Sequence, residues 1–161
     1  DRRLSIFTSN LLKNQSVPTP EPSVNPSPIV LVVEDAPDNL ALIVQIFDGS
    51  GYIIQAVHDG IAAMTWLEQN LPDLILLDLS IPAMDGWEVA RRLKADRRTA
   101  DIPIVAITAN AMLGDKEAAI AAGCNDYLPK PLDIEQLENR VKYWLSQKSS
   151  GDKATNKDLG S

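Results

Sequence analysis

Short runs of aliphatic residues alternate along the chain with segments whose apolar residues recur at helical spacing. The first run is 29–33, and after it Leu40, Ile43, Val44 and Phe47 recur at i, i+3, i+4 and i+7, one face of a helix. Four more runs are each followed by a helical segment, at 52–57, 73–78, 102–107 and 126–128. Uniformly apolar strands are typical of a sheet covered on both faces. The pattern therefore predicts five strand–helix units.

Residues that favour helix ends mark the boundaries of these helices. Pro37 suits the first turn of the first helix, and the Asp59-Gly60 pair opens the second. Asp85 and Asp133 are expected as N-caps, each with Glu or Gln three residues later as in a capping box. The Ala-rich segment 111–122 is predicted as a helix that ends at Gly123.

Strands that alternate with helices indicate a parallel sheet with helices on both faces. Right-handed crossovers leave few topologies for five such units. The expected fold class is α/β, a doubly wound five-stranded parallel sheet of the flavodoxin-like (βα)5 type, with strand order 2-1-3-4-5. In this order the second strand lies at an edge, so His58 at its end lies far from the centre of the sheet.

Both ends of the chain differ in composition from the middle. Residues 1–28 are predicted as a linker, disordered or partly helical, because they hold Pro18, Pro20, Pro22, Pro26 and Pro28 among Ser, Thr and Asn. One domain is expected over 29–146. From Gln147 to Ser161 the residues are mostly polar, and this segment is predicted as a disordered tail.

Composition and charge narrow the possible functions. The chain has 161 residues, 45% hydrophobic and 23% charged, as expected for one domain with a core. A net charge of −7 without a Lys/Arg cluster argues against direct nucleic-acid binding. Because Cys124 is the single cysteine, an intrachain disulfide is excluded and a reducing compartment is favoured. Cys124 is expected to be a buried thiol. No apolar run reaches the length of a membrane span. A chain that begins at Asp1 is expected to be a fragment or a processed protein.

Polar residues gather where the central strands end, the edge at which ligands bind in open α/β sheets. Glu34 and Asp35 follow the first strand and Asp78 ends the third; Thr108 follows the fourth and Lys130 the fifth. Carboxylates this close repel one another unless their pKa values rise or a cation joins them. Oxygen ligands in an incomplete protein shell suit Mg²⁺. Together with a lysine and a hydroxyl donor, they are the groups that an in-line phosphoryl transfer onto a carboxylate requires.

These residues and their neighbours resemble one known family. The segments are Glu34-Asp35, Asp78 within 78–86 (DLSIPAMDG), Thr108-Ala109 and 127–131 (YLPKP). In this order they closely resemble the receiver domain of two-component response regulators, the CheY-like family, over roughly 29–145. Two positions depart from the usual family pattern: Ile81 stands where Met is common, and the acidic pair is Glu-Asp rather than Asp-Asp. Neither change removes a functional group.

The resemblance implies a role for each residue of the site. Asp78 would be the phosphoacceptor, and Lys130 would pair with the phosphoryl oxygens. Asp35, Asp78 and the backbone carbonyl of Ser80 would hold Mg²⁺, with Glu34 acting partly through water. A domain of this kind catalyses its own phosphorylation and autodephosphorylation, but it is not by itself an enzyme that turns over a separate substrate.

The resemblance also implies a switch and its partners. Thr108 would turn inward to the phosphoryl group and Tyr127 would follow, which changes the face made by the fourth helix, fifth strand and fifth helix. The phosphodonor would be a histidine kinase or histidine phosphotransfer protein, and the output a protein effector. Neither nucleic acid nor a membrane is expected to touch this segment, and the expected location is cytoplasmic, including the cytoplasmic end of a larger sensor kinase.

Segments 107–112 and 122–127 look most like the receivers attached to hybrid sensor kinases, and the Pro-rich linker agrees with a C-terminal receiver of such a kinase. A single-domain regulator is the alternative. Two other functions stay open. A pseudo-receiver would act as an interaction module without phosphate, and a haloacid-dehalogenase-like phosphatase would also use a strand-end Asp with Mg²⁺. The latter needs a second Asp two positions after the nucleophile, where this chain has Ser80.

Overall fold

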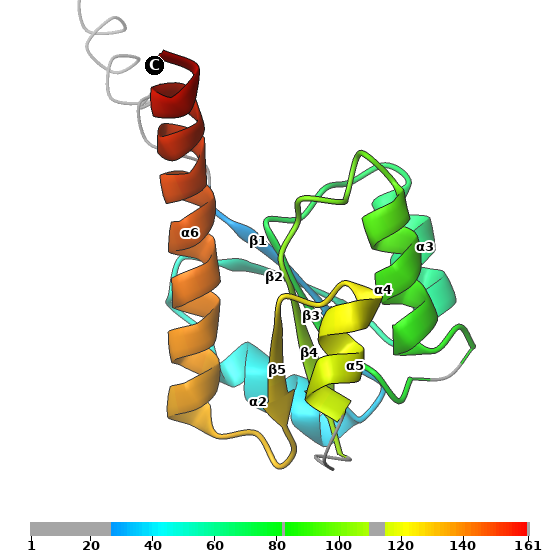
Figure 1. Ribbon diagram of the computed structural model, residues 1–161. Helices are drawn as coiled ribbons and strands as arrows, with labels where there is room; N and C mark the ends of the chain where they lie inside the picture. Colours follow the sequence, from blue (N-terminus) through cyan, green and yellow to red (C-terminus); the bar gives the residue numbers. More distant parts are fainter. Residues whose placement is uncertain (1–26, 82, 110–114, 161) are drawn as a thin grey trace, which may run out of the picture.

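The computed structural model describes residues 27–81, 83–109 and 115–160, and they contain one sheet of five parallel strands (Figure 1). The strands are β1 (Ile29–Val33), β2 (Ile53–Val57), β3 (Leu74–Asp78), β4 (Ile104–Thr108) and β5 (Asp126–Pro129). Between and after them lie α2 (Pro37–Ile46), α3 (Gly60–Leu67), α4 (Gly86–Ala95), α5 (Asp115–Ala122) and α6 (Ile134–Gly160). The strand order is β2-β1-β3-β4-β5, which confirms the predicted topology and fold class.

Two hydrophobic clusters, one on each face of the sheet, form the core. Because successive residues of a strand point to opposite faces, Val30 and Val32 of β1 join one cluster while Leu31 and Val33 join the other. The first cluster includes side chains of α2 and α6, and the second includes side chains of α3, α4 and α5. Figure 1 shows α6 on one side of the sheet and α3, α4 and α5 on the other. Coverage on both faces explains why the central strands β1, β3 and β4 are apolar up to their carboxyl ends.

The register of the sheet brings the carboxyl ends of the central strands together. Asp78 at the end of β3 pairs with Ile107, and Thr108 at the end of β4 pairs with Pro129. Two backbone hydrogen bonds continue the ladder past the strands: Leu79 N donates to Ile107 O at 2.9 Å, and Lys130 N donates to Thr108 O at 2.7 Å. The residues that follow β3 and β5 therefore lie on the two sides of the end of β4.

Three of the predicted helix starts are confirmed by side-chain caps. The carboxylate of Asp59 accepts from Ala62 N at 2.7 Å, that of Asp85 from Glu88 N at 2.9 Å, and that of Asp133 from Gln136 N at 2.9 Å. β4 begins at Ile104, two residues later than predicted. Pro103 lacks an N–H for the ladder, although its carbonyl still accepts from Ile75 N at 3.0 Å.

The ends of the chain compare differently with their predictions. α6 continues to Gly160, so the structure has helix where the sequence predicts a disordered tail from Gln147. The polar segment gives no packing signal, but Lys, Gln and Ala are good helix formers, and a helix already started by packing extends at low cost. The predicted linker before Ser27 and the first residues of the predicted helix 111–122 lie outside the described residues.

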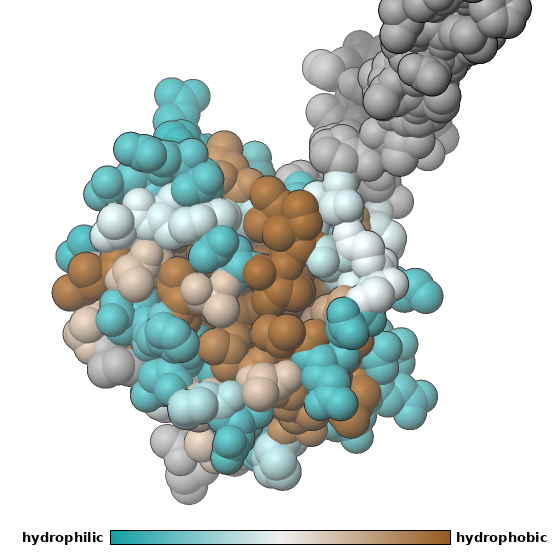
Figure 2. All heavy atoms as spheres, turned by 180° about the vertical axis from the view of Figure 1, so that it is seen from behind, coloured by the Kyte–Doolittle hydropathy of each residue, from teal (hydrophilic) through white to brown (hydrophobic). Residues whose placement is uncertain are grey.

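One face of the molecule exposes apolar side chains. Seen from the side opposite to Figure 1, hydrophobic residues form a continuous band (Figure 2). Exposed apolar side chains include Val44 of α2, 46% exposed, and Ile53 of the edge strand β2, 51% exposed. Among the described helices, none combines the length and the apolar character that crossing a membrane requires.

Candidate functional site

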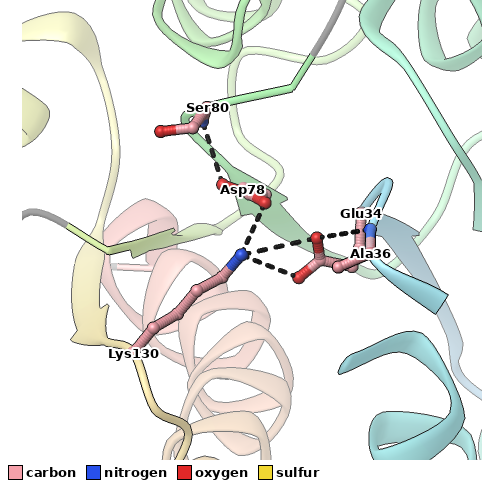
Figure 3. Close-up of polar contacts among 5 residues, drawn as sticks. All are labelled: Glu34, Ala36, Asp78, Ser80 and Lys130. Carbon is pink, nitrogen blue, oxygen red and sulfur yellow. Dashed lines mark hydrogen bonds and ion pairs between the residues drawn. The ribbon is translucent and has the colours of Figure 1, made fainter. Parts of the chain in front are cut away.

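Three segments far apart in the sequence bring charged side chains to the carboxyl edge of the sheet. Glu34 follows β1, Asp78 ends β3 and Lys130 follows β5. The Lys130 ammonium lies between the two carboxylates, 2.8 Å from Asp78 Oδ2 and 3.2 Å from Glu34 Oε1 (Figure 3). Glu34 is fully buried and Asp78 is 1% exposed, so all three charges interact where water screens them weakly.

Backbone N–H groups hold each carboxylate from the opposite side. Ser80 N donates to Asp78 Oδ1 at 2.9 Å, and Ala36 N donates to Glu34 Oε2 at 3.2 Å (Figure 3). Each donor comes two residues after its acceptor, the spacing at which an acidic side chain folds back on its own turn. Neither N–H group is among the predicted site groups, because the sequence pattern identifies side chains. The signal that points to them is an acidic residue at the start of a turn.

The two buried carboxyls have pKa values shifted in opposite directions. Burial raises the pKa of Glu34, and the neighbouring Asp78 carboxylate adds to this effect. Burial also acts to raise the pKa of Asp78, but contacts with the Glu34 carboxyl, the Lys130 ammonium and the Ser80 N–H together hold the pKa of Asp78 below its usual value. Asp78 is therefore the more acidic carboxyl of the pair.

Lys130 stays charged for a related reason. Burial alone lowers the pKa of Lys130, but the hydrogen bond and charge of Asp78, with the charge of Glu34, outweigh burial and raise it. A buried site thus combines an ionised carboxylate with a permanent cation.

The site also fits a divalent cation. Glu34, Asp35 and Asp78 each offer a carboxylate oxygen, and these oxygens lie within 4.8 Å of one another. Glu34 Oε1 is buried and accepts no hydrogen bond, although the Lys130 ammonium lies within ion-pair distance of it. Since hard oxygen ligands with room for water suit Mg²⁺, the donor set matches the cation expected from the sequence.

The remaining predicted residues lie around this cluster. Asp35 is exposed at the rim, and Ser80, also exposed, reaches the site through its backbone. Thr108 is 4% exposed at the end of β4, and its carbonyl accepts from Lys130 N. Tyr127 is half-buried and packs against the cluster that includes α3, α4 and α5. Each of them lies on β4 or β5, or in the segment that follows β1 or β3.

Two residues that the sequence assigns to structural roles lie apart from the cluster. His58 follows the edge strand β2 and lines a groove on α2. Cys124 is a buried free thiol, and burial raises its pKa to about 11. The peptide bond Lys130–Pro131 is cis.

Comparison with known proteins gives a consistent set of relatives. The family model described as the response regulator receiver domain matches residues 30–142. The DNA-binding dual master transcriptional regulator RpaA of Synechocystis is 40% identical over 118 residues, 73% of this chain and 49% of RpaA. The sensor protein GacS of Pseudomonas syringae is 39% identical over 121 residues, 73% of this chain but 13% of GacS. The response regulator DivK of Brucella ovis is 35% identical over 116 residues, 72% of this chain and 94% of DivK.

Two solved structures are similar to this chain in fold and in sequence. The receiver domain of sensor histidine kinase PA1611 from Pseudomonas aeruginosa, with a magnesium ion coordinated in its active site cleft, gives a TM-score of 0.69 at 37% identity, with 74% of this chain and 98% of that chain covered. The receiver domain of Saccharomyces cerevisiae Ssk1, crystallised with the histidine phosphotransfer protein Ypd1, gives 0.71 at 27% identity, with 78% and 93% covered. This chain belongs to the response regulator receiver domain family of two-component signalling.

Proposed function

We propose that this chain accepts a phosphoryl group on Asp78 from a phosphohistidine, and that the resulting acyl phosphate switches a protein-interaction face. The observation that carries the proposal is the buried contact of 2.8 Å between Asp78 and Lys130 beside Glu34. A carboxylate kept ionised next to a fixed ammonium has both a nucleophile and a positive charge for the incoming phosphoryl oxygens.

The transfer step is a displacement at phosphorus. An oxygen of the Asp78 carboxylate forms a bond to phosphorus while the bond from phosphorus to the donor imidazole nitrogen breaks, and the imidazole leaves with its electron pair. Lys130 stabilises the negative charge on the phosphoryl oxygens, and the buried Thr108 hydroxyl is proposed to donate to one of them. Attack by water on the acyl phosphate returns Asp78 and releases inorganic phosphate.

A magnesium ion is proposed as the cofactor. Asp35, Asp78 and the Ser80 carbonyl would hold it, with Glu34 partly through water. When bound, the ion neutralises charge on the transferring phosphoryl group. Magnesium in the PA1611 receiver domain supports this assignment, as does the buried Glu34 oxygen without a hydrogen bond.

The proposed switch couples Asp78 to the face made by α5, β5 and α6. Thr108 ends β4, which lies between Asp78 on β3 and the half-buried Tyr127 on β5. A phosphoryl group that draws Thr108 inward would leave space that Tyr127 can fill, and the effector would bind the altered face. Exposed Ile120 on α5 supplies apolar surface there.

The proposed phosphodonor is a histidine kinase or a histidine phosphotransfer protein. The Ssk1 receiver was crystallised with such a phosphotransfer protein. An apolar groove on α2, lined in part by Leu40, Val44 and His58, begins directly after the acidic pair and offers a contact surface beside the site. The resemblance to GacS favours a receiver that is part of a hybrid sensor kinase, with a cytoplasmic location.

A mass measurement tests the phosphoacceptor proposal. Purified protein is incubated with Mg²⁺ and acetyl phosphate, and its intact mass is recorded with and without hydroxylamine. We expect one phosphoryl adduct that hydroxylamine removes, present in wild type and in the control Asp101→Asn, whose carboxylate is exposed and remote from the cluster, and absent in Asp78→Asn. A folded, Mg²⁺-binding wild type without an adduct would instead favour a phosphorylation-independent pseudo-receiver.

A further inference from the structure

The first turn of α3 lies in close contact with the loop that follows the proposed phosphoacceptor. Gly60, the buried first residue of α3, lies against Met84 in the β3–α4 connection. A Cβ added at Gly60 would overlap the Met84 carbonyl oxygen and lie 2.8 Å from the carbonyl carbon, far inside van der Waals contact. Only a residue without a side chain fits between this turn and the loop in their present positions.

The turn that carries Gly60 is not free to give way. The Asp59 side chain caps α3 by accepting from Ala62 N at 2.7 Å, and the backbone carbonyl of Asp59 accepts from Ala63 N at 3.0 Å. Ala63 is fully buried in the core. An added side chain at position 60 would therefore move the loop rather than the helix.

The loop has an unfavourable backbone conformation at Ala83. Ala83 has φ of +67°, in the left-handed region that is unfavourable for a residue with a Cβ. At the far end of the loop, Gly86 is packed so closely that an added Cβ would lie 2.5 Å from Asp78 O and from Leu79 Cα. The loop is thus fixed at one end by the Gly86 contact with β3, and along its course by the contact of Met84 with Gly60.

The position of this loop matters to the site because the loop begins at Ser80. The Ser80 N–H donates to Asp78 Oδ1, and the same residue is proposed to offer its carbonyl to Mg²⁺. Met84 lies four residues further on, across the strained Ala83. A displacement of Met84 would act on a loop whose two ends, at Ser80 and Gly86, both contact Asp78.

We propose that Gly60 is a positioning residue for the cation and phosphoacceptor site. It is expected to touch neither the cation nor Asp78, and to act by letting residues 83–85 lie against the first turn of α3, so that the Ser80 backbone N–H stays directed at Asp78. The inference rests on the proposed function, because it assigns to Gly60 a role in the same site.

The test compares two glycine variants that share one substitution. Gly60→Ala meets Met84, whereas Gly51→Ala, at φ of +92° with no heavy atom within 4 Å of the added Cβ, introduces backbone strain remote from the loop. Mg²⁺ affinity is measured by calorimetry and stability by urea unfolding. We expect the Mg²⁺ dissociation constant to rise about 10-fold in Gly60→Ala, the scale of losing a group that orients a metal ligand. Gly51→Ala should be less stable but should bind Mg²⁺ as wild type does.

A measurement on the unaltered protein covers the case in which Gly60→Ala does not fold. In a titration of wild type with Mg²⁺ followed by amide NMR, the Gly60 resonance should shift with the same dissociation constant as that of Ser80, while the Gly51 resonance should stay in place. A Gly60 resonance that does not move, or equal Mg²⁺ affinity in wild type and folded Gly60→Ala, overturns the inference alone. Wild type that takes neither Mg²⁺ nor phosphoryl group overturns the proposed function instead.

Discussion

Two partly buried lysines of this domain have opposite surroundings. Lys130 lies against the carboxylates of Asp78 and Glu34, and its pKa is raised because these charges outweigh burial. Lys94 of α4 donates to neutral oxygens, the carbonyls of Ala100 and Ile102 at 2.9 and 3.1 Å and the side-chain oxygen of Asn125 at 3.3 Å. Burial lowers the pKa of Lys94, and electrostatic interactions with Cys124 and Asp101 offset burial only in part.

The difference separates a lysine that can act from one that holds the fold together. The acceptors of Lys94 are neutral groups fixed in the backbone or in Asn125, which itself accepts from Ile104 N at 2.9 Å. Lys94 therefore ties the end of α4 to the entries of β4 and β5. The acceptors of Lys130 include the carboxylate of the proposed nucleophile, Asp78. The Lys130 ammonium can therefore exchange its contact with this carboxylate for a contact with the oxygens of an incoming phosphoryl group.

The largest effect is expected from removing the Lys130 charge. Lys130→Met should slow phosphorylation by acetyl phosphate about 100-fold, the scale seen when a charge-stabilising group is lost from an active site. The rate is measured by intact mass against time at saturating Mg²⁺. Wild-type rates in Lys130→Met would mean that the ion pair is only structural.

The thiol beside Lys94 should be unreactive in the folded protein. The pKa of Cys124 is raised by burial from 9.0 to about 11, and the nearby Lys94 charge does not reverse this. Between pH 9 and 11 the Cys124 thiol therefore keeps its proton in the folded protein but loses it in the unfolded protein. The contribution of Cys124 to the free energy of unfolding falls as pH rises through that range.

At pH 8 the thiolate fraction should be about 100-fold lower in folded than in unfolded protein, because two pKa units separate the states. Reaction with a disulfide reagent such as DTNB, with and without urea, measures the ratio. Equal rates in the two states would show that Cys124 is accessible and that the Lys94 region is open.

Lys94→Met should lower stability and leave the rate of phosphorylation unchanged, whereas Lys130→Met is expected to slow phosphorylation. The Ala100 and Ile102 carbonyls lose their donor, which costs about 2 kcal/mol of unfolding free energy by the usual penalty for unpaired buried polar groups. Urea unfolding measures this loss, and phosphorylation of the folded variant should keep the wild-type rate. If Lys94→Met instead slowed phosphorylation without lowering stability, the contrast between the two lysines would be lost.

The smallest effect on stability is expected from Arg92→Ala, on the exposed surface of α4, the helix that also carries Lys94. Arg92 pairs with Glu88 at 3.0 Å, and both side chains are well exposed. Arg92→Ala should leave the urea midpoint within experimental error, because water screens exposed pairs, although the pKa of Glu88, which Arg92 lowers, should rise toward its usual value. A clear drop in the midpoint would show that charge on α4 supports the fold at its surface as well as at Lys94.

Much of the fold and the site could be predicted because each depends on local signals. Apolar runs indicate the strands, and strand ends point to Asp78, Glu34 and Lys130. The structure places a carboxylate oxygen of Asp78 and one of Glu34 within 3.2 Å of the Lys130 ammonium. The contact between Gly60 and Met84 could not be predicted, because it depends on how closely α3 approaches a loop, which no residue type encodes. The Lys94 contacts could not be predicted for the same reason: a helix pattern gives Lys94 a surface position, but its acceptors lie in the segments just before β4 and β5.

The most direct test of the central claim locates the phosphoryl group. Wild type is phosphorylated with acetyl phosphate and Mg²⁺, reduced with borohydride, which converts an aspartyl phosphate to homoserine, and digested for peptide mass spectrometry. If Asp78 is the phosphoacceptor, homoserine appears at position 78 alone, and only when both acetyl phosphate and Mg²⁺ were present. Homoserine at another aspartate, or none in folded protein that binds Mg²⁺, would contradict it.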